Sequence, residues 1–317
     1  MLAVLPFENY SHDPAKDYFA EGLTDEMIAQ LGRLSPKKLG VIARTSAMRY
    51  KNTSKPIVQI GHELRVSYIL EGGTRQFENR VRITAELIHV EDQTQVWSSS
   101  YEQKLEDIFA VQNAVALSIA DALAVELLPS VQETFRKVRT VNPQAHEAYL
   151  QGRFHLSKLT GQELEKARQY FEDAIKIDPN YPAAYVGLSD YYVLMYELPP
   201  KIAMAQAREY AQKALALDNG LPAAHLALAW IEYNSWDWHE SEQQFEIAIK
   251  LNPSDAEAHR AYSIFLSTLG RSNEASAEAH AALELDPLSV VIRTTAGWVA
   301  YFARDYDPRK AYLYNGF

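Results

Sequence analysis

The sequence predicts two structural classes in one chain: an α+β domain at the amino-terminal end, followed by an all-α superhelical solenoid of repeated helix pairs. Two observations lead to this prediction. A pattern of small, aromatic and proline residues returns several times between Asn142 and about Phe302. Before position 130, runs of alternating polarity are interleaved with runs of helical period. A length of 317 residues is also suited to roughly two domains.

The repeated pattern is anchored by prolines at 143, 179, 253 and 287, with Asn219 standing where a fifth would fall. The spacings between these positions are 36, 40, 34 and 34 residues. Ladders of small or aromatic residues precede and follow the anchors, starting at Ala167, Ala207, Ser241, Ala275, and at Tyr149, Tyr185, His225, His259, Arg293. Their steps of three, four and seven place each ladder on one helical face. Proline then ends each helix pair, because it cannot continue a helix.

This array resembles the tetratricopeptide family, whose unit is a helix–turn–helix of 34 residues. The phrases Ala174–Pro179 and Ala248–Pro253 are similar to the usual closing sequence of that unit. The resemblance covers four full repeats and the first helix of a fifth, with short insertions near Lys158–Glu163 and Glu197–Ile202. It implies a stacked solenoid with a concave surface.

The amino-terminal region predicts the order strand, helix, strand, helix, three strands, helix, which is typical of an α+β layer. Asp13-Pro14 is expected to cap a helix that runs to Gly32 with a break at Gly22. We expect Glu71-Gly72-Gly73 to form a bulge or bend in a strand. The other expected elements are strands at Leu2–Phe7, Lys38–Arg44, Ser67–Phe77, Arg80–Val90 and Gln95–Tyr101, and helices at Pro56–Leu64 and Leu105–Leu128.

Five ordered motifs make residues 2–128 similar to the TolB amino-terminal-like domain. These motifs are Ala3–Asn9, Tyr18–Thr24, Val41–Ser46, Tyr68–Gly72 and Leu105–Phe109. The resemblance implies a regulatory or sensory domain of a bacterial signalling protein, preceding tetratricopeptide repeats. In such proteins it follows a winged-helix DNA-binding domain, a nucleotide cyclase or a protein kinase. We expect the domains to span 1–130 and 143–317, joined by a connector at 131–142.

Composition excludes several classes of function. The net charge of −10 is concentrated in residues 141–317, which carry 15 basic and 23 acidic groups. Direct binding of nucleic acid is therefore not expected, because phosphate binding requires a basic surface. There is no cysteine, and no apolar run approaches the length of a membrane span. The sequence leaves the compartment open between cytoplasm and periplasm, and we expect the chain to be a piece of a longer protein.

We expect no enzyme active site, cofactor or metal in this chain. Phosphate-loop, nucleophile-elbow and zinc-protease motifs are all absent from the sequence. His239-Glu240 begins the last of these, but Gln243 stands where the second histidine would be. His225 and His259 occupy ladder positions, so a core or capping role is expected for both.

Two surfaces are candidate binding sites. The first contains three cations and two hydroxyls within eight residues: Arg44, Thr45, Ser46, Arg49 and Lys51. Such a group of side chains could hold an anion. The alternative is a solvated loop in which Thr45 or Ser46 caps a turn.

The second surface is the inner face of the solenoid. Five residues after the first-ladder position of each repeat come Phe154, Asp190, Trp230, Ile264 and Trp298. The same predicted helices also carry Tyr233, Asn234, Arg260 and Tyr301. Aromatic residues with a few polar anchors favour a groove for an extended peptide. The alternative is that these aromatic residues pack between successive repeats.

The sequence therefore predicts a non-catalytic, regulatory protein-interaction module. Two other classes stay open: the regulatory half of a cyclase or kinase whose catalytic domain lies outside this chain, and a small-ligand sensor. The fifth repeat has no room for a capped second helix, which leaves apolar residues such as Val291, Val299 and Phe302 uncovered. We expect a second copy of the chain to cover them, with contacts from Tyr312, Leu313, Tyr314 and Phe317, unless the tail folds back on its own repeat.

Overall fold

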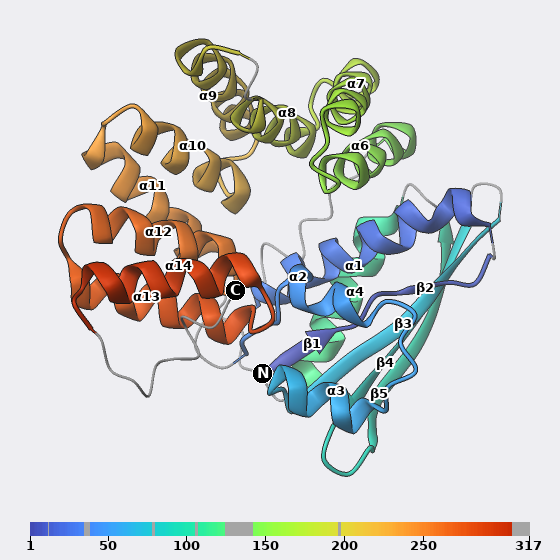
Figure 1. The fold of residues 1–317 in the computed structure, drawn as a ribbon. Helices are drawn as coiled ribbons and strands as arrows, with labels where there is room; N and C mark the ends of the chain where they lie inside the picture. Colours follow the sequence, from blue (N-terminus) through green and yellow to red (C-terminus); the bar gives the residue numbers. More distant parts are fainter. Residues whose placement is uncertain are drawn as a thin grey trace.

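The computed structural model describes residues 1–11, 13–34, 39–77, 80–104, 107–123, 142–195 and 198–305. An α+β part at the amino-terminal end is followed by an arc of paired helices that curves over it (Figure 1). The predicted fold class is therefore confirmed. Among the described helices, none combines the length and hydropathy that crossing a bilayer requires.

The α+β part is built on a five-stranded sheet of order β1-β3-β4-β5, with β2 also paired to β3. The strands β1 and β2 run parallel to β3, whereas β3, β4 and β5 form an antiparallel meander. The bounds are Leu2–Val4 for β1, Glu8–Asn9 for β2, Tyr68–Phe77 for β3, Arg80–His89 for β4 and Gln95–Lys104 for β5. The three predicted alternating runs are confirmed as β3, β4 and β5, because alternation places one side chain in two on each face.

Helices cover both faces of this sheet. The helices α1 (Asp17–Gly32) and α4 (Ile108–Ala122) pack on the face that carries Leu70 and Leu87. The helix α3 (Ile57–Leu64) packs on the opposite face against Ile69. Both faces are apolar for this reason, and the sheet separates two hydrophobic clusters.

The first helical segment begins as predicted. The Asp13 carboxylate accepts a hydrogen bond from the Ala15 amide, and the short 3-10 helix η1 (Pro14–Lys16) leads into α1. The break that we expected at Gly22 is absent, because α1 is continuous from Asp17 to Gly32. Gly22 instead permits a close approach: a Cβ there would lie 2.5 Å from Cδ2 of Leu150 in the solenoid.

The strand predicted at Lys38–Arg44 is wrong over the part of that range that the structure describes. Only Val41 forms a bridge, parallel to Leu2, after which the chain turns into α2 (Arg44–Ala47) and the 3-10 helix η2 (Met48–Tyr50). The backbone amide of Val41 bonds to the solenoid and not to a strand: it donates a hydrogen bond to Ser254 Oγ at 3.2 Å. Tertiary contacts have replaced a sheet ladder here.

The expected bulge at Glu71-Gly72-Gly73 is also absent. These residues pair in unbroken register with Glu86, Ala85 and Thr84 of β4. The glycines are explained by close neighbours, since a Cβ on Gly72 would lie 2.0 Å from the Thr84 carbonyl oxygen. The irregularity of the sheet falls instead between β4 and β5, where Leu87 pairs with Trp97 and Ile88 with Gln95, so that the register skips Val96.

The solenoid consists of four helix pairs and the first helix of a fifth, as predicted for residues 143–302. The pairs are α6 (Pro143–Leu156) with α7 (Gly161–Ile177), α8 (Pro182–Leu194) with α9 (Pro200–Leu217), α10 (Pro222–Asn234) with α11 (Trp238–Leu251), and α12 (Ala256–Thr268) with α13 (Ser272–Leu285). The last helix is α14 (Val290–Phe302). Proline occupies the first position of four of these helices, where its missing amide costs nothing.

Small residues let these helices approach closely. Ala207, Ala211 and Ala214 on α9 are fully buried, as are Ala167 and Ala174 on α7. The expected role of the two ladder histidines is confirmed. His225 Nε2 lies 2.9 Å from the carbonyl oxygen of Asn219, and His259 Nε2 lies 3.1 Å from that of Pro253. Each histidine therefore ties the start of a helix to the turn that precedes it.

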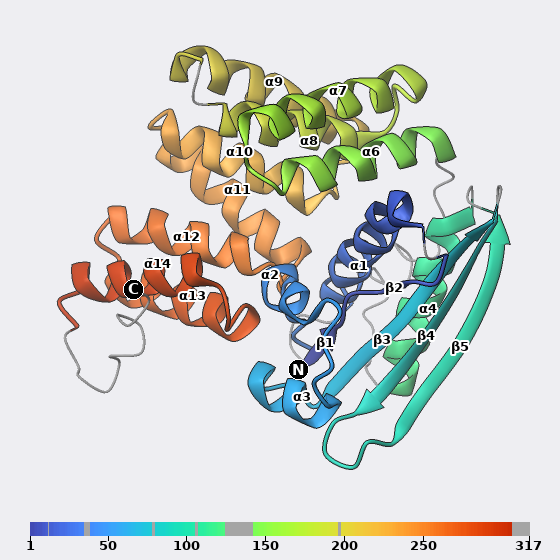
Figure 2. The same cartoon turned by 45° about the vertical axis from the view of Figure 1, so that its right-hand side comes forward.

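The inner side of the solenoid arc holds α1 and α2 of the α+β part (Figure 2). Tyr18 on α1 donates a hydrogen bond to Glu147 on α6 at 2.7 Å. Ser46 on α2 donates to Asp286, at the carboxyl end of α13, at 2.5 Å. The first and the fourth repeats are thereby both fastened to the same domain.

Several expectations fall on residues outside the described ranges. They are the turn at Glu78-Asn79, most of the connector at 131–142, the ends of the helix predicted at Leu105–Leu128, and the tail that contains Tyr312, Leu313, Tyr314 and Phe317.

Candidate functional site

The inner face of the solenoid is formed by the first helix of each pair, and contacts between neighbouring repeats align it. The Arg153 guanidinium lies 3.5 Å from Asp190 of the next repeat. The Arg260 guanidinium lies 5.6 Å from the centre of the Trp230 ring. These contacts join the first helices of repeats one and two and those of repeats three and four.

The amino-terminal end of this face is covered by the α+β part. Phe154 packs against the hydrophobic core that α1, α4 and the sheet share, and Leu150 is part of that core. Lys158 Nζ lies 4.1 Å from the centre of the Phe154 ring. Phe154 is therefore a docking residue between the two parts of the chain rather than an open part of a groove.

Asp190 on α8 is paired with Arg153 of the first repeat. Its side chain is 32% exposed, yet burial among surrounding atoms raises its pKa to about 6 despite the charge of Arg153. A carboxylate held in this way favours a cationic or hydrogen-bond-donating neighbour.

The centre of the face is packed. Trp230 makes an edge contact with Tyr233, with ring centres 5.5 Å apart, and another with Phe245 at 6.2 Å. Arg260 is 15% exposed and binds Glu257 through two nitrogens, at 2.7 and 2.5 Å. Asn234 donates to the carbonyl oxygen of Trp230 at 2.7 Å, within its own helix. Tyr233 also contacts Phe265 on α12 of the next repeat, with ring centres 6.3 Å apart. Packing within and between repeats therefore accounts for Trp230 and Tyr233.

The carboxyl-terminal end of the face is open. Trp298 is 61% exposed and Tyr301 is 59% exposed, and Phe302 beside them is 68% exposed. Between α12 and α14 lies a hollow of about 170 Å³, lined mainly by Ile264, Thr268, Trp298 and Phe302. Exposed aromatic side chains around an apolar hollow are the arrangement that anchors a bound peptide.

Sequence reasoning missed the hollow and Phe302 as part of the same surface. Alignment of the repeats predicted Ile264 and Trp298 at equivalent positions. Phe302 lies one helical turn beyond Trp298, so the same periodicity could have found it. Val299, which we expected to be uncovered, is buried at 3% exposure in the cluster formed with α12 and α13.

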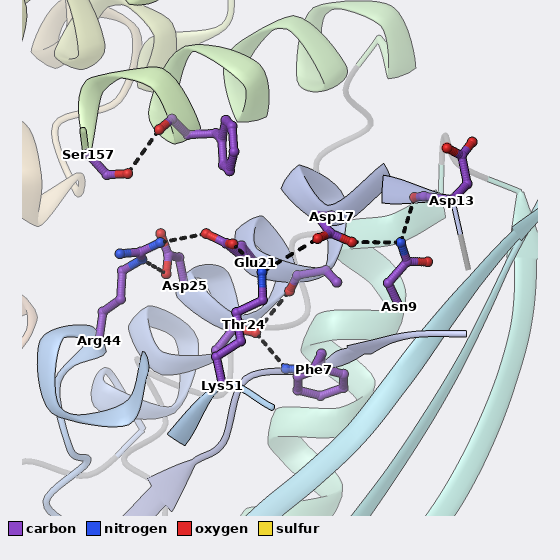
Figure 3. Close-up of polar contacts among 12 residues, drawn as sticks. Phe7, Asn9, Asp13, Asp17, Glu21, Thr24, Asp25, Arg44, Lys51 and Ser157 are labelled. Atoms are coloured by element: carbon purple, nitrogen blue, oxygen red, sulfur yellow. Dashed lines mark hydrogen bonds and ion pairs between the residues drawn. The ribbon is translucent and has the colours of Figure 1, made fainter. Parts of the chain in front are cut away.

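The predicted anion site forms a network of ion pairs with α1 (Figure 3). Arg44 lies 3.0 Å from Glu21 and 2.5 Å from Asp25. Lys51 Nζ lies 2.9 Å from Glu21 and 3.6 Å from Asp17. Two of the three cations thus have carboxylate partners within the chain.

The hydroxyls of the same segment face the solenoid. Ser46 Oγ donates to Asp286 and accepts a hydrogen bond from the Leu288 amide at 2.9 Å. Burial raises the pKa of Asp286, whereas bonds from Ser46 and Thr45 and the charge of Arg49 act to lower it. Ser46 therefore joins the α+β part to the solenoid, whereas the ion pairs of Arg44 and Lys51 lie within the α+β part. Binding of an external anion here stays a prediction.

Both parts of the chain are similar to known protein families. Residues 1–118 match the family profile of the HilA/YgeH-like transcriptional regulator, second domain, and residues 159–181 match the tetratricopeptide repeat. The chain is 37% identical over 188 residues to "Putative adenylate cyclase 3" of Rhizobium meliloti (strain 1021), covering 59% of this chain and 32% of that protein.

It is also 24% identical over 311 residues to the transcriptional regulator HilA of Salmonella typhimurium, covering 96% of this chain and 54% of that protein. The chain thus spans about a third of the first relative and about half of the second.

Solved structures give a weaker likeness. The tetratricopeptide protein TTC0263 of Thermus thermophilus is similar with a TM-score of 0.44 and 22% identity, covering 61% of this chain and 96% of that one. YrrB, described as a tetratricopeptide protein with an unusual peptide-binding site, gives a TM-score of 0.38 and 20% identity, covering 60% and 90%. The solenoid fold of this chain is therefore defined by its own helix pairs and not by these similarities.

Proposed function

We propose that this chain is a non-catalytic, regulatory protein-interaction module that captures an extended peptide segment of a partner protein. The observation that carries the proposal is the open surface at α12 and α14, where Trp298 and Phe302 line the apolar hollow and Tyr301 on the same helix is exposed. The match to the tetratricopeptide repeat supports a role in protein binding. The HilA-like match over residues 1–118 supports a role in regulation.

The finer features of the proposal concern the whole protein. We take the domains to span 1–130 and 143–317, and the likeness of residues 2–128 to the TolB amino-terminal-like domain is part of the proposal. The reaction or gene under control would belong to an effector outside this chain. The names of the two relatives favour a transcription regulator or a nucleotide cyclase over a protein kinase.

Trp298→Ala tests the proposed surface. Peptides selected by display on the full chain should bind this variant about thirtyfold or more weakly, because truncating a central aromatic anchor costs about 2 kcal/mol or more. The melting temperature should stay within about 2 °C of the parent, since the side chain is largely exposed. Binding is measured by fluorescence anisotropy of the labelled peptides.

Trp236→Ala is the matched control. Trp236 is 74% exposed, but it lies in the turn between α10 and α11 and not on the inner face. This variant should keep full affinity. Equal loss of affinity in both variants, or none in Trp298→Ala, would show that the selected peptides bind elsewhere.

A second copy of the chain is the other candidate occupant of the same end. Val291 and Phe302 on α14 are 61% and 68% exposed. Apolar surface therefore remains uncovered among the described residues of the last repeat. A solenoid end normally carries a polar cap. Light scattering at tens of micromolar should therefore give a dimer for the intact chain and a monomer for a chain ending at Asp307. Monomers in both cases would contradict dimerisation through this end.

A further inference from the structure

A second hollow lies within the α+β part, away from the solenoid surface. Its volume is about 450 Å³, which falls in the range of sites for small molecules. Its walls come from β2, β3 and β4, from α1, from residues 50–55 and from the start of α3. The function proposed above does not use this cavity.

Three carboxylates from neighbouring strands meet on one side of the cavity. Glu71 on β3 is the direct cross-strand partner of Glu86 on β4. Glu8 on β2 is paired with Gly73, two residues further along β3. Carboxylates directly opposite each other in a sheet repel and lower its stability. Burial raises the pKa of Glu71, and the charges of Glu86 and Glu8 raise it further.

The cations of the cavity wall are held by other carboxylates. Lys51 is bound to Glu21 and Asp17 on α1, as described above (Figure 3). Lys55 Nζ lies 2.8 Å from Glu63 on α3. Among the ion pairs between described residues, none involves the three glutamates of the strands. A hydrogen bond with Glu86 also helps to raise the pKa of Glu71, and no described lysine or arginine lies within ion-pair distance of these carboxylates.

The rest of the wall carries apolar groups as well as the polar groups of residues 50–55. Leu5, Ile57 and Ile60 are its apolar lining, and the ring of Tyr10 lies against Gly73 of β3. Burial and the charge of Glu8 raise the pKa of Tyr10, so its phenol stays a neutral hydrogen-bonding group. A ligand that fits both sides has a cationic end and a short hydrocarbon body.

We propose that this cavity binds a small organic cation, a protonated amine on a short aliphatic or aromatic body. The ammonium group would lie between Glu71 and Glu86, where it removes their mutual repulsion, and the body would lie against Ile57 and Ile60. A metal ion is a poorer fit, because no group of three potential ligands among the described residues converges closely enough to hold one. The proposal goes beyond peptide capture and does not depend on it.

Thermal unfolding of the full chain with benzylamine and n-butylamine tests the proposal. Each amine should raise the melting temperature in a concentration-dependent manner, by about 2–4 °C near saturation, because a ligand of the folded state stabilises it by mass action. Benzyl alcohol, n-butanol and sodium chloride at equal concentration should give no such rise. Equal shifts with the amines and their neutral counterparts would overturn the proposal.

Glu71→Gln assigns the response to this cavity. The variant keeps the side-chain shape and removes one of the two opposed charges, so it should melt at a higher temperature than the parent without ligand. It should also lose the response to amines, and Glu86→Gln should behave in the same way. Glu91→Gln, in the exposed turn after β4, should retain the response. A response that persists in both cavity variants would overturn the proposal.

Trp298→Ala separates the two proposals of function. This variant should keep the full response to amines, because α14 contributes nothing to the cavity. Loss of peptide binding with an intact amine response supports both sites. An amine response that disappears in Trp298→Ala would contradict the location proposed here.

Discussion

Phe171→Ala is expected to lower the free energy of unfolding by about 3–5 kcal/mol, the range found when a buried phenylalanine is truncated. Phe171 on α7 is completely buried between the first and second repeats. Its ring is held by two glycines, Gly152 on α6 and Gly187 on α8. A Cβ on either glycine would lie 2.5 Å from the ring. Urea unfolding followed by circular dichroism measures the change.

Two companion variants make this expectation specific. Phe302→Ala removes a ring that is 68% exposed, so it should change the free energy of unfolding by about 0.5 kcal/mol or less. Gly187→Ala should destabilise the parent, because the added methyl group collides with the ring. In the Phe171→Ala background the same change should become neutral or stabilising by up to about 1 kcal/mol, since only helix propensity remains. Additive effects would show that the glycine and the ring are not coupled.

The spacing of Phe171 and its neighbouring alanines shows why the solenoid could be predicted from the sequence. Phe171 and the alanines on its helix repeat at steps of three, four and seven, and each step reports a contact with the adjacent helix. These contacts are local in the chain, so periodicity is sufficient to find them. The three strands β3, β4 and β5 were predictable for a related reason, because short turns join them in sequence order.

Contacts between the two parts of the chain could not be predicted in this way. Gly22 looked like a helix break because its partner, Leu150, is distant in the sequence. Val41 looked like the centre of a strand, but Ser254 of the solenoid accepts a hydrogen bond from its amide. Propensity describes a segment alone, and these segments adopt conformations that a distant element determines.

For the candidate sites too, local spacing was predictable and contacts distant in the sequence were not. Repeat alignment placed Phe154, Asp190, Trp230 and Trp298 on one face, but it could not show that the α+β part covers Phe154. For the second cavity, a two-residue turn predicted at Glu78-Asn79 would already pair Glu71 with Glu86. The cavity itself was beyond reach, because α1 and residues 50–55 form its walls through tertiary contacts.

The contact between the two parts also buries an ionisable group, Glu26 on α1. Its side chain is 16% exposed, and one oxygen accepts a hydrogen bond from Gln112 on α4. The other oxygen lies 3.7 Å from His146 Nε2 on α6, whose Nδ1 lies 3.1 Å from the Tyr181 hydroxyl. Burial raises the pKa of Glu26 to about 8 and lowers the pKa of His146 to about 4. Both side chains are thus neutral at the interface at pH 7.

These two pKa shifts act on stability in opposite directions. The folded state holds the Glu26 proton more tightly than the unfolded state, whose carboxyl pKa is near 4.5. Stability from this group is present below pH 4.5 and is lost as the pH rises toward 8. For His146 the folded state binds a proton less tightly, so stability is lost as the pH falls from 6.5 toward 4.

Glu26→Gln should therefore stabilise the protein increasingly as the pH rises. Glutamine keeps the shape and the hydrogen bond with Gln112, can donate to His146, and cannot ionise. At about pH 5 the variant and the parent should unfold at nearly the same urea concentration. At about pH 8 the variant should be more stable by about 2–4 kcal/mol, somewhat less than the full pKa difference implies because Glu26 is not completely buried. The control Glu91→Gln, at an exposed turn, should show no pH-dependent difference. A Glu26→Gln advantage that is constant over this pH range, or that grows toward low pH, would show that the folded state does not hold an extra proton on Glu26.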